Sequence, residues 1–100
     1  MRLRCVIAAE AQNELAEAMQ WYDRQSPGVS SRLWLEFEGL ARRLAAMPQV
    51  YSSFGERGVR KARLRIFPYA VYYRVAGEEL RILGVIHQAR NPELARKRFG

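Results

Sequence analysis

The alternation of apolar and polar residues over positions 57–92 predicts three consecutive β-strands separated by two tight reversals. Pro68 ends the first strand because it has no backbone N–H to donate, and Gly77 begins the second reversal. The second strand, residues 69–76, is rich in β-branched and aromatic side chains. The third strand, residues 80–87, is apolar on both faces, which is typical of a strand in the centre of a sheet.

Helical spacing of apolar residues predicts two helices before these strands. The first begins at Ala8 or Ala9 and ends near Gln25, and its apolar stripe is Ala11, Leu15, Ala18, Met19 and Tyr22. We expect Ser26 to cap the second helix and Pro27 to occupy its first position. The second stripe is Leu33, Phe37, Leu40, Leu44 and Met47, and Pro48 ends the helix. Trp21 and Trp34 are expected to pack between the helices or in the core.

Short elements complete the order at both ends of the chain. Residues 2–7 alternate as a strand, which we expect beside the last strand, and Asn91 and Pro92 precede a short helix over residues 94–99. The order β-αα-βββ-α predicts a single α+β domain over residues 1–100. In it, an antiparallel helical hairpin packs on one face of a small, mainly antiparallel sheet that includes the N-terminal strand.

Composition narrows the class of protein. The chain is 49% apolar, which favours a globular fold, and no apolar run approaches the roughly 18 residues of a membrane span. We see no secretory signal and expect a cytoplasmic protein. Cys5 is the only cysteine and is expected to be a small buried residue of the first strand. With one cysteine and one histidine the chain cannot form a Cys/His zinc site alone, and no phosphate loop is present, so we expect no metal or cofactor.

The net charge of +7 lies entirely in the second half of the sequence. Residues 1–50 carry six arginines and six acidic residues, whereas residues 51–100 carry eleven basic and four acidic residues. Such an asymmetry indicates an anionic partner, either nucleic acid or an acidic protein segment. A basic, solvated face without a partner is the alternative.

The candidate chemistry is a basic strand face together with one histidine. Alternation along the first sheet strand places Ala62, Leu64 and Ile66 on one side and Lys61, Arg63 and Arg65 on the other. Such basic residues can hold phosphates, stabilise a pentavalent phosphate during RNA cleavage, or bind acidic side chains. His87, at the end of the last strand, can act as a general acid or base, although a single histidine there is more often a surface residue. Tyr72 is a candidate for base stacking.

Several segments in this order resemble the RelE/ParE superfamily of bacterial type II toxins, which includes plasmid stabilisation proteins. They are the end of the second helix (LAAMP, 44–48), RLRIFPY (63–69), VYYRV (71–75), ILGVIH (82–87), RNP (90–92) and the basic residues 96–98. The resemblance covers nearly the whole chain. It implies a toxin that forms a hetero-oligomer with a cognate antitoxin, whose acidic C-terminal segment wraps over the helices and sheet of the toxin.

The resemblance leaves the cellular target open. Nuclease members of the superfamily cut messenger RNA on the ribosome with basic residues and a C-terminal Tyr or His. This chain has no Tyr after the last strand, and Ala70 and Tyr72 stand where nucleases often carry an arginine. These departures favour the ParE-like branch, which poisons DNA gyrase by trapping its cleaved DNA complex.

Three hypotheses follow, and the first is favoured. The protein is a gyrase-directed toxin without its own active site, a ribosome-dependent mRNA endonuclease, or a non-toxic homologue that binds only the antitoxin. In the nuclease hypothesis the catalytic residues are Arg63, Arg65, His87 and Arg90. The residues expected to contact the antitoxin or target are Lys61, Arg63, Arg65, Arg74, Arg90, Arg96, Lys97 and Arg98.

Overall fold

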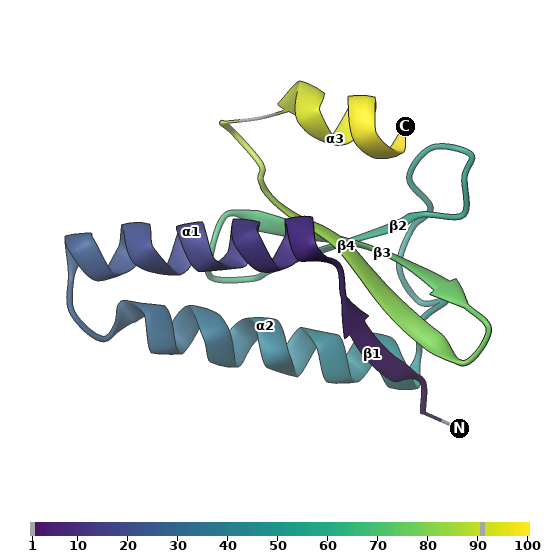
Figure 1. Cartoon of the computed structure of the whole chain (residues 1–100), viewed down its shortest axis with the longest axis horizontal. Coiled ribbons are helices and arrows are strands. Elements are labelled where there is room, and N and C mark those ends of the chain that lie inside the picture. The colour runs from purple at the N-terminus through teal and green to yellow at the C-terminus, as the bar shows by residue number, and fades with distance from the viewer. Residues whose placement is uncertain (1, 91) are drawn as a thin grey trace.

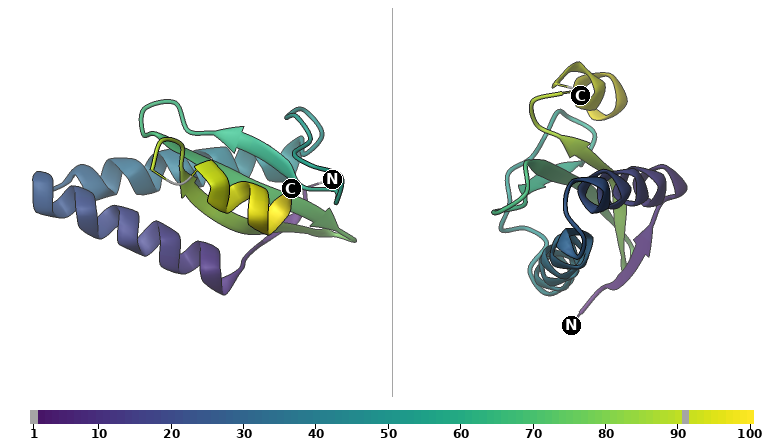
Figure 2. Two further views of the ribbon diagram at one scale, coloured as in Figure 1. Left: turned by 90° about the horizontal axis from the view of Figure 1, so that it is seen from above. Right: turned by 90° about the vertical axis from the view of Figure 1, so that its left-hand side faces the viewer.

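The computed structural model describes residues 2–90 and 92–100 and has the predicted α+β architecture (Figure 1). A four-stranded sheet carries a helical hairpin on one face and a short helix on the other (Figure 2). The strands are β1 (Arg4–Ile7), β2 (Arg60–Arg63), β3 (Tyr69–Ala76) and β4 (Glu79–His87). The helices are α1 (Ala9–Gln25), α2 (Val29–Ala46) and α3 (Pro92–Phe99). None of these helices combines the length and the hydropathy needed to cross a membrane.

The strand order is β1-β4-β3-β2, so the last strand is central, as the sequence predicted. β4 pairs in parallel with β1 and antiparallel with β3, and β3 pairs antiparallel with β2. The sheet is therefore mainly antiparallel. The parallel pairing arises because the helical hairpin carries the chain back across the sheet between β1 and the later strands.

Two cores lie on opposite faces of the sheet. The larger core joins the α1 and α2 stripes to Tyr73, Leu80 and Ile82, each fully buried. The smaller core lies under α3, where the Phe99 ring stacks on Tyr72 at 5.0 Å between centroids. The helical stripes are as predicted except for Met47, which follows the end of α2 and is 61% exposed.

A β-bulge in β4 explains how one strand serves both cores. Tyr72 is opposite Gly84 and Tyr73 is opposite Ile82, so Leu83 is an extra residue on β4. Ile82 and Val85 therefore both face the helical hairpin, whereas Leu83 packs on the α3 side. Simple alternation would have placed Ile82 and Val85 on opposite faces.

The prediction that Arg65 continues the basic face of the first sheet strand is wrong. β2 ends at Arg63, and the chain then turns toward α2, where the Glu36 carboxylate accepts the backbone N–H groups of Arg65 and Ile66. Leu64 is buried as expected, but Ile66 is 69% exposed. A side chain from α2, far away in the sequence, thus ends the strand.

The link between α1 and α2 also differs from the prediction. The Ser26 N–H donates to the Tyr22 carbonyl at 2.9 Å, so Ser26 caps the end of α1 rather than the start of α2. α2 begins at Val29, and its N-cap is Gly28 with φ of 89°, a backbone conformation that favours glycine. The chain therefore needs Ser26, Pro27 and Gly28 for the reversal itself.

Three further expectations about single residues are corrected or lie outside the described chain. Trp21 and Trp34 are 39% and 38% exposed, so neither is a core residue. Cys5 is exposed because β1 is an edge strand with β4 as its neighbour. α3 begins at Pro92, two residues earlier than expected, and the capping role expected of Asn91 lies outside the described residues.

Candidate functional site

Most basic residues of the predicted site line one of three hollows, two of which share Ile86 and His87. The Arg90 cleft lies between α1, the end of β4 and the segment that leads to α3. The α3 hollow lies between α3 and the sheet. The α2–β2 groove lies between α2 and the residues around the end of β2.

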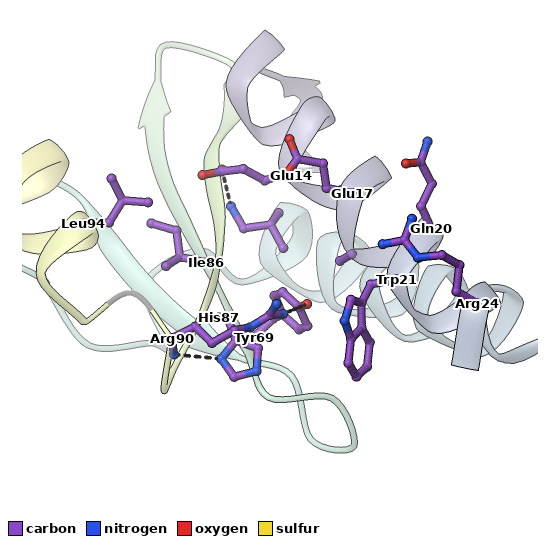
Figure 3. A pocket seen from close by; sticks show the side chains of 12 residues that line it. Glu14, Glu17, Gln20, Trp21, Arg24, Tyr69, Ile86, His87, Arg90 and Leu94 are labelled. Atoms are coloured by element: carbon purple, nitrogen blue, oxygen red, sulfur yellow. Dashed lines mark hydrogen bonds between the residues drawn. The ribbon is translucent and has the colours of Figure 1, made fainter. Parts of the chain in front are cut away.

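The Arg90 cleft has a volume of about 490 Å³ and is drawn in Figure 3. α1 contributes Trp21 and Arg24 to one wall, and the opposite wall carries Tyr69, His87 and Arg90. Further along α1, the cleft is lined by Glu14, Glu17 and Gln20. The cleft therefore places cationic, aromatic and acidic groups around one space.

The Arg90 side chain is held by two aromatic residues. Its Nη2 donates a hydrogen bond to the Tyr69 hydroxyl at 2.8 Å. Its guanidinium carbon lies 5.6 Å from the centroid of the Trp21 ring, within the range of a cation–π interaction. Among the described residues, no carboxylate forms an ion pair with Arg90.

His87 supports the backbone of the segment that carries Arg90. Its Nδ1 accepts hydrogen bonds from the N–H groups of Ala89 and Arg90, both at 3.1 Å. Burial, and next the positive charge of Arg90, lower the pKa of His87 below its usual value of 6.5. The histidine is therefore neutral at pH 7, and this hydrogen bonding assigns its proton to Nε2.

Tyr69 is a rigid part of the cleft wall. Its ring is buried in the larger core and makes edge-to-face contacts with Tyr22 and His87, with centroids 6.4 Å and 5.1 Å away. Burial raises the pKa of Tyr69, and the charge of Arg90 opposes this effect. The hydroxyl thus stays protonated at pH 7 and is a fixed acceptor for Arg90.

The α3 hollow, of about 190 Å³, contains Lys61. Its Nζ lies 5.7 Å and 5.8 Å from the ring centroids of Phe54 and Tyr72. Burial, and next the charge of Arg63, lower the pKa of Lys61. Arg96 lines the same hollow from α3 and forms an exposed ion pair with Glu93 at 3.4 Å.

The α2–β2 groove has a volume of about 810 Å³, the largest of these three hollows. It brings Arg63 and Arg65 together with Arg43 from α2. Two strongly exposed apolar side chains, Leu35 and Ile66, line it at 64% and 69% exposure. Its surface therefore combines positive charge with apolar area.

The remaining residues of the predicted contact set, Arg74, Lys97 and Arg98, do not line any of these three hollows. Arg74 is exposed on β3, and Lys97 is exposed on α3. Arg98 instead points into the molecule, where its guanidinium pairs with Glu14 at 2.5 Å and donates to the Leu83 carbonyl at 2.8 Å. Its side chain is 18% exposed, so most of its surface already contacts this chain.

Sequence reasoning missed the role of Trp21 in the cleft. Trp21 precedes Tyr22 of the apolar stripe and is therefore rotated about 100° away from it on the helix. That offset was a usable signal for a partly exposed aromatic residue. The approach of Arg90 had no local signal, since Arg90 and Trp21 are brought together only when the end of β4 packs beside α1.

The fold and the hollows define a small, basic α+β domain suited to binding anionic groups. Among residues 2–90 and 92–100, no cluster of three His, Cys, Asp or Glu side chains is placed to hold a metal ion.

Comparison with known proteins gives the family. The sequence matches the family of the ParE toxin of the type II toxin–antitoxin system, parDE, over residues 6–92. The chain therefore belongs to the ParE toxin family, which agrees with the resemblance seen in the sequence. No curated protein sequence matches it.

Two solved structures share the fold at low sequence identity. One is a chromosomal ParDE toxin–antitoxin system from P. aeruginosa, with a TM-score of 0.75 and 18% identity, covering 86% of this chain and 96% of that chain. The other is the toxin–antitoxin complex RelBE2 from Mycobacterium tuberculosis, with a TM-score of 0.59 and 20% identity, covering 87% and 99%.

Proposed function

We propose that this ParE-family protein is a toxin that poisons DNA gyrase in the cytoplasm and is neutralised by a cognate antitoxin with an acidic C-terminal segment. The observation that carries the proposal is that the candidate nuclease residues fall into two separate pairs, His87 with Arg90 and Arg63 with Arg65. Arg65 lines the α2–β2 groove, whereas Arg90 lies in the Arg90 cleft on Tyr69 and Trp21. Residues that stabilise one phosphoryl transition state must converge on a single point.

The bonding of His87 supports the same proposal. A general base needs a free lone pair, but Nδ1 of His87 accepts two backbone N–H groups. Nε2 carries the proton of the neutral imidazole, which prevails at pH 7 because the pKa of His87 is lowered, and the N–H of a neutral imidazole is a very weak acid. Its arrangement suits a structural role better than a catalytic one.

The charge distribution supports an acidic antitoxin segment as the partner. The excess of seven positive charges lies in residues 51–100, and the α2–β2 groove adds exposed apolar side chains to its arginines. An extended segment with alternating acidic and apolar residues would complement such a surface. The complex is expected to be a toxin–antitoxin hetero-oligomer.

One feature favours the second candidate function, ribosome-dependent cleavage of messenger RNA. Lys61 and His87 both line the α3 hollow, beside the ring of Tyr72. A lysine next to an aromatic ring can bind a phosphate beside a stacked base. The hollow is small, however, and Tyr72 is only 2% exposed because the Phe99 ring stacks on it, so the expectation that Tyr72 stacks on a base is wrong.

The test uses the toxin freed from its antitoxin. It is added to gyrase with supercoiled plasmid and ATP, and in parallel to a translating extract with a labelled message. We expect linear plasmid and an intact message. A cut message with unaffected plasmid would replace gyrase poisoning by the nuclease function, and no effect in either assay would leave a homologue that only binds its antitoxin.

A further inference from the structure

We propose that Arg90 and Trp21 form a clamp for a carboxylate side chain of the antitoxin. The clamp is the guanidinium of Arg90 held between the Trp21 ring and the Tyr69 hydroxyl in the Arg90 cleft. The inference rests on the proposed function for the identity of the partner. It adds the place where one acidic residue binds and the groups that recognise it.

The first argument is that Arg90 is held in place before any ligand binds. Its backbone N–H is bound by His87, its Nη2 by Tyr69, and its face lies against Trp21. A flexible arginine loses side-chain entropy when it binds, and an arginine already fixed loses much less. These contacts occupy one N–H and one face of the guanidinium, which leaves the other N–H groups of this cleft-lining arginine available to a ligand.

The second argument is that the clamp lacks a counter-ion of its own. Glu14, which also lines the cleft, is already paired with Arg98 and accepts the N–H of Val85. Glu17 forms no ion pair with any described residue, and neither does Arg90. A carboxylate from outside can therefore form a charge-assisted, two-point contact with Arg90 without displacing an internal partner.

The third argument selects a protein segment over nucleic acid. Glu17 on the α1 wall, which has no ion-pair partner among the described residues, would repel the repeated charges of a phosphate backbone. In a segment of alternating acidic and apolar residues one carboxylate can bind Arg90 while its neighbours in the chain are uncharged, and Arg24, which also lines the cleft, adds attraction for it. Ile86 and Leu94 supply apolar surface for the side chain next to the acidic one.

The test measures binding of the purified toxin to the protein encoded by the neighbouring reading frame. Arg90→Gln should weaken binding on the order of 10- to 100-fold, because it removes the charge at the centre of the contact. Arg90→Lys should restore little, since an ammonium group neither stacks on Trp21 nor makes the two-point contact. Arg57→Gln removes the same charge from an exposed loop and should change binding less than about threefold.

Two further measurements separate the clamp from a general loss of structure. In a Trp34→Phe background Trp21 is the remaining tryptophan, so its fluorescence should change when the antitoxin binds and should not change in the Arg90→Gln variant. Tyr69→Phe, which keeps the buried ring, should weaken binding by a smaller factor than Arg90→Gln. One Glu→Gln or Asp→Asn change in the antitoxin should weaken binding by the same factor as Arg90→Gln. Combining that change with Arg90→Gln should weaken binding no further.

The outcomes are distinct from those of the gyrase assay. A folded Arg90→Gln protein that binds within twofold of the unchanged toxin overturns the clamp, even if gyrase is poisoned. The clamp is also overturned if Arg90→Gln weakens binding of the toxin to a DNA oligonucleotide while antitoxin binding is kept. If the neighbouring product does not bind the unchanged toxin, the choice of partner is wrong and the proposal falls, whereas the plasmid assay still decides the action on gyrase.

Discussion

Arg98 of α3 lies 2.5 Å from a carboxylate oxygen of Glu14 on α1, across 84 residues of sequence. The same arginine donates to the Leu83 carbonyl, and the other Glu14 oxygen accepts the N–H of Val85 at 3.0 Å. Arg98 and Glu14 thus connect α3, β4 and α1. Both side chains are largely buried, and Arg98 also pairs with Glu10 of α1 at 3.3 Å, so Arg98 is a polar attachment of α3 to the rest of the fold.

Arg98→Gln should destabilise the protein by about 2 kcal/mol, because Glu14 is left as a partly buried charge without its partner. For a domain of this size, that corresponds to a fall in Tm of roughly 8–16 °C. Arg96→Gln is the matched control. Its pair with Glu93 is 73% and 64% exposed and should contribute less than about 0.5 kcal/mol. Equal melting temperatures for the two variants would contradict the assigned role of Arg98.

Gly84→Ala should also destabilise the protein, by about 1–3 kcal/mol. A Cβ at Gly84 would lie 2.9 Å from Cζ of Phe99 and 3.2 Å from Nη2 of Arg98, so the Phe99 ring would have to shift from its stacked position on Tyr72 and Arg98 from the Leu83 carbonyl. Gly39→Ala provides a control of opposite sign. Its Cβ would meet only Arg43 at 3.8 Å, and alanine in a helix is more favourable than glycine by up to about 1 kcal/mol. Chemical denaturation of both variants measures the difference.

The stability of the protein should fall as the pH decreases below the usual His value of 6.5. The pKa of His87 is lowered in the fold, so between the two values the unfolded chain binds more protons than the folded one. The contribution of neutral His87 to the stability of the protein is therefore complete above pH 6.5. It is lost as the pH falls through the lower pKa that His87 has in the folded state. Protonation of Nδ1 would also end its bonds to the N–H groups of Ala89 and Arg90.

His87→Asn tests this dependence, because asparagine offers a similarly placed oxygen acceptor that does not titrate. As the pH is lowered from 7.5 to 5.5, the melting temperature should fall more steeply for the unchanged protein than for the variant. Parallel curves over this range would show that His87 does not control the stability of the Arg90 segment.

The proposed mode of action predicts how toxicity responds to single substitutions. If the protein acts on gyrase through a surface, Lys61→Ala, Arg65→Ala and His87→Ala should each reduce plasmid linearisation by no more than about tenfold. A catalytic acid, base or phosphate-stabilising group contributes 10²–10⁴-fold or more. Loss on that larger scale in an mRNA cleavage assay, with the variants still folded, would favour the nuclease instead.

The elements and their order could be predicted because they depend on local periodicity. The stripes of α1 and α2 and the alternation in β3 are each complete within a short window of sequence. The central place of β4 also followed, since a strand apolar on both faces needs cover on both. These features need no information from distant residues.

The errors that change the candidate site involve distant residues, whereas those at the α1–α2 link and at the start of α3 are local. The end of β2 depends on Glu36, about 30 positions earlier, and the change of face in β4 depends on an unequal count of residues against β3. The candidate site was affected in the same way. Arg63, Arg65 and Arg90 were correctly singled out as basic surface residues, but their assignment to separate hollows depends on those two irregularities and on the packing of α1.

The parallel pairing of β1 with β4 has a consequence for protein synthesis. Arg4 is opposite Glu79, so the first strand has no partner until the last strand has been translated. β3 and β4 can pair as a local hairpin, but the sheet that the helical hairpin covers is completed only after β4 has been translated. The Arg90 cleft, which needs α1, β4 and the segment after it, therefore cannot form before that segment has been synthesised.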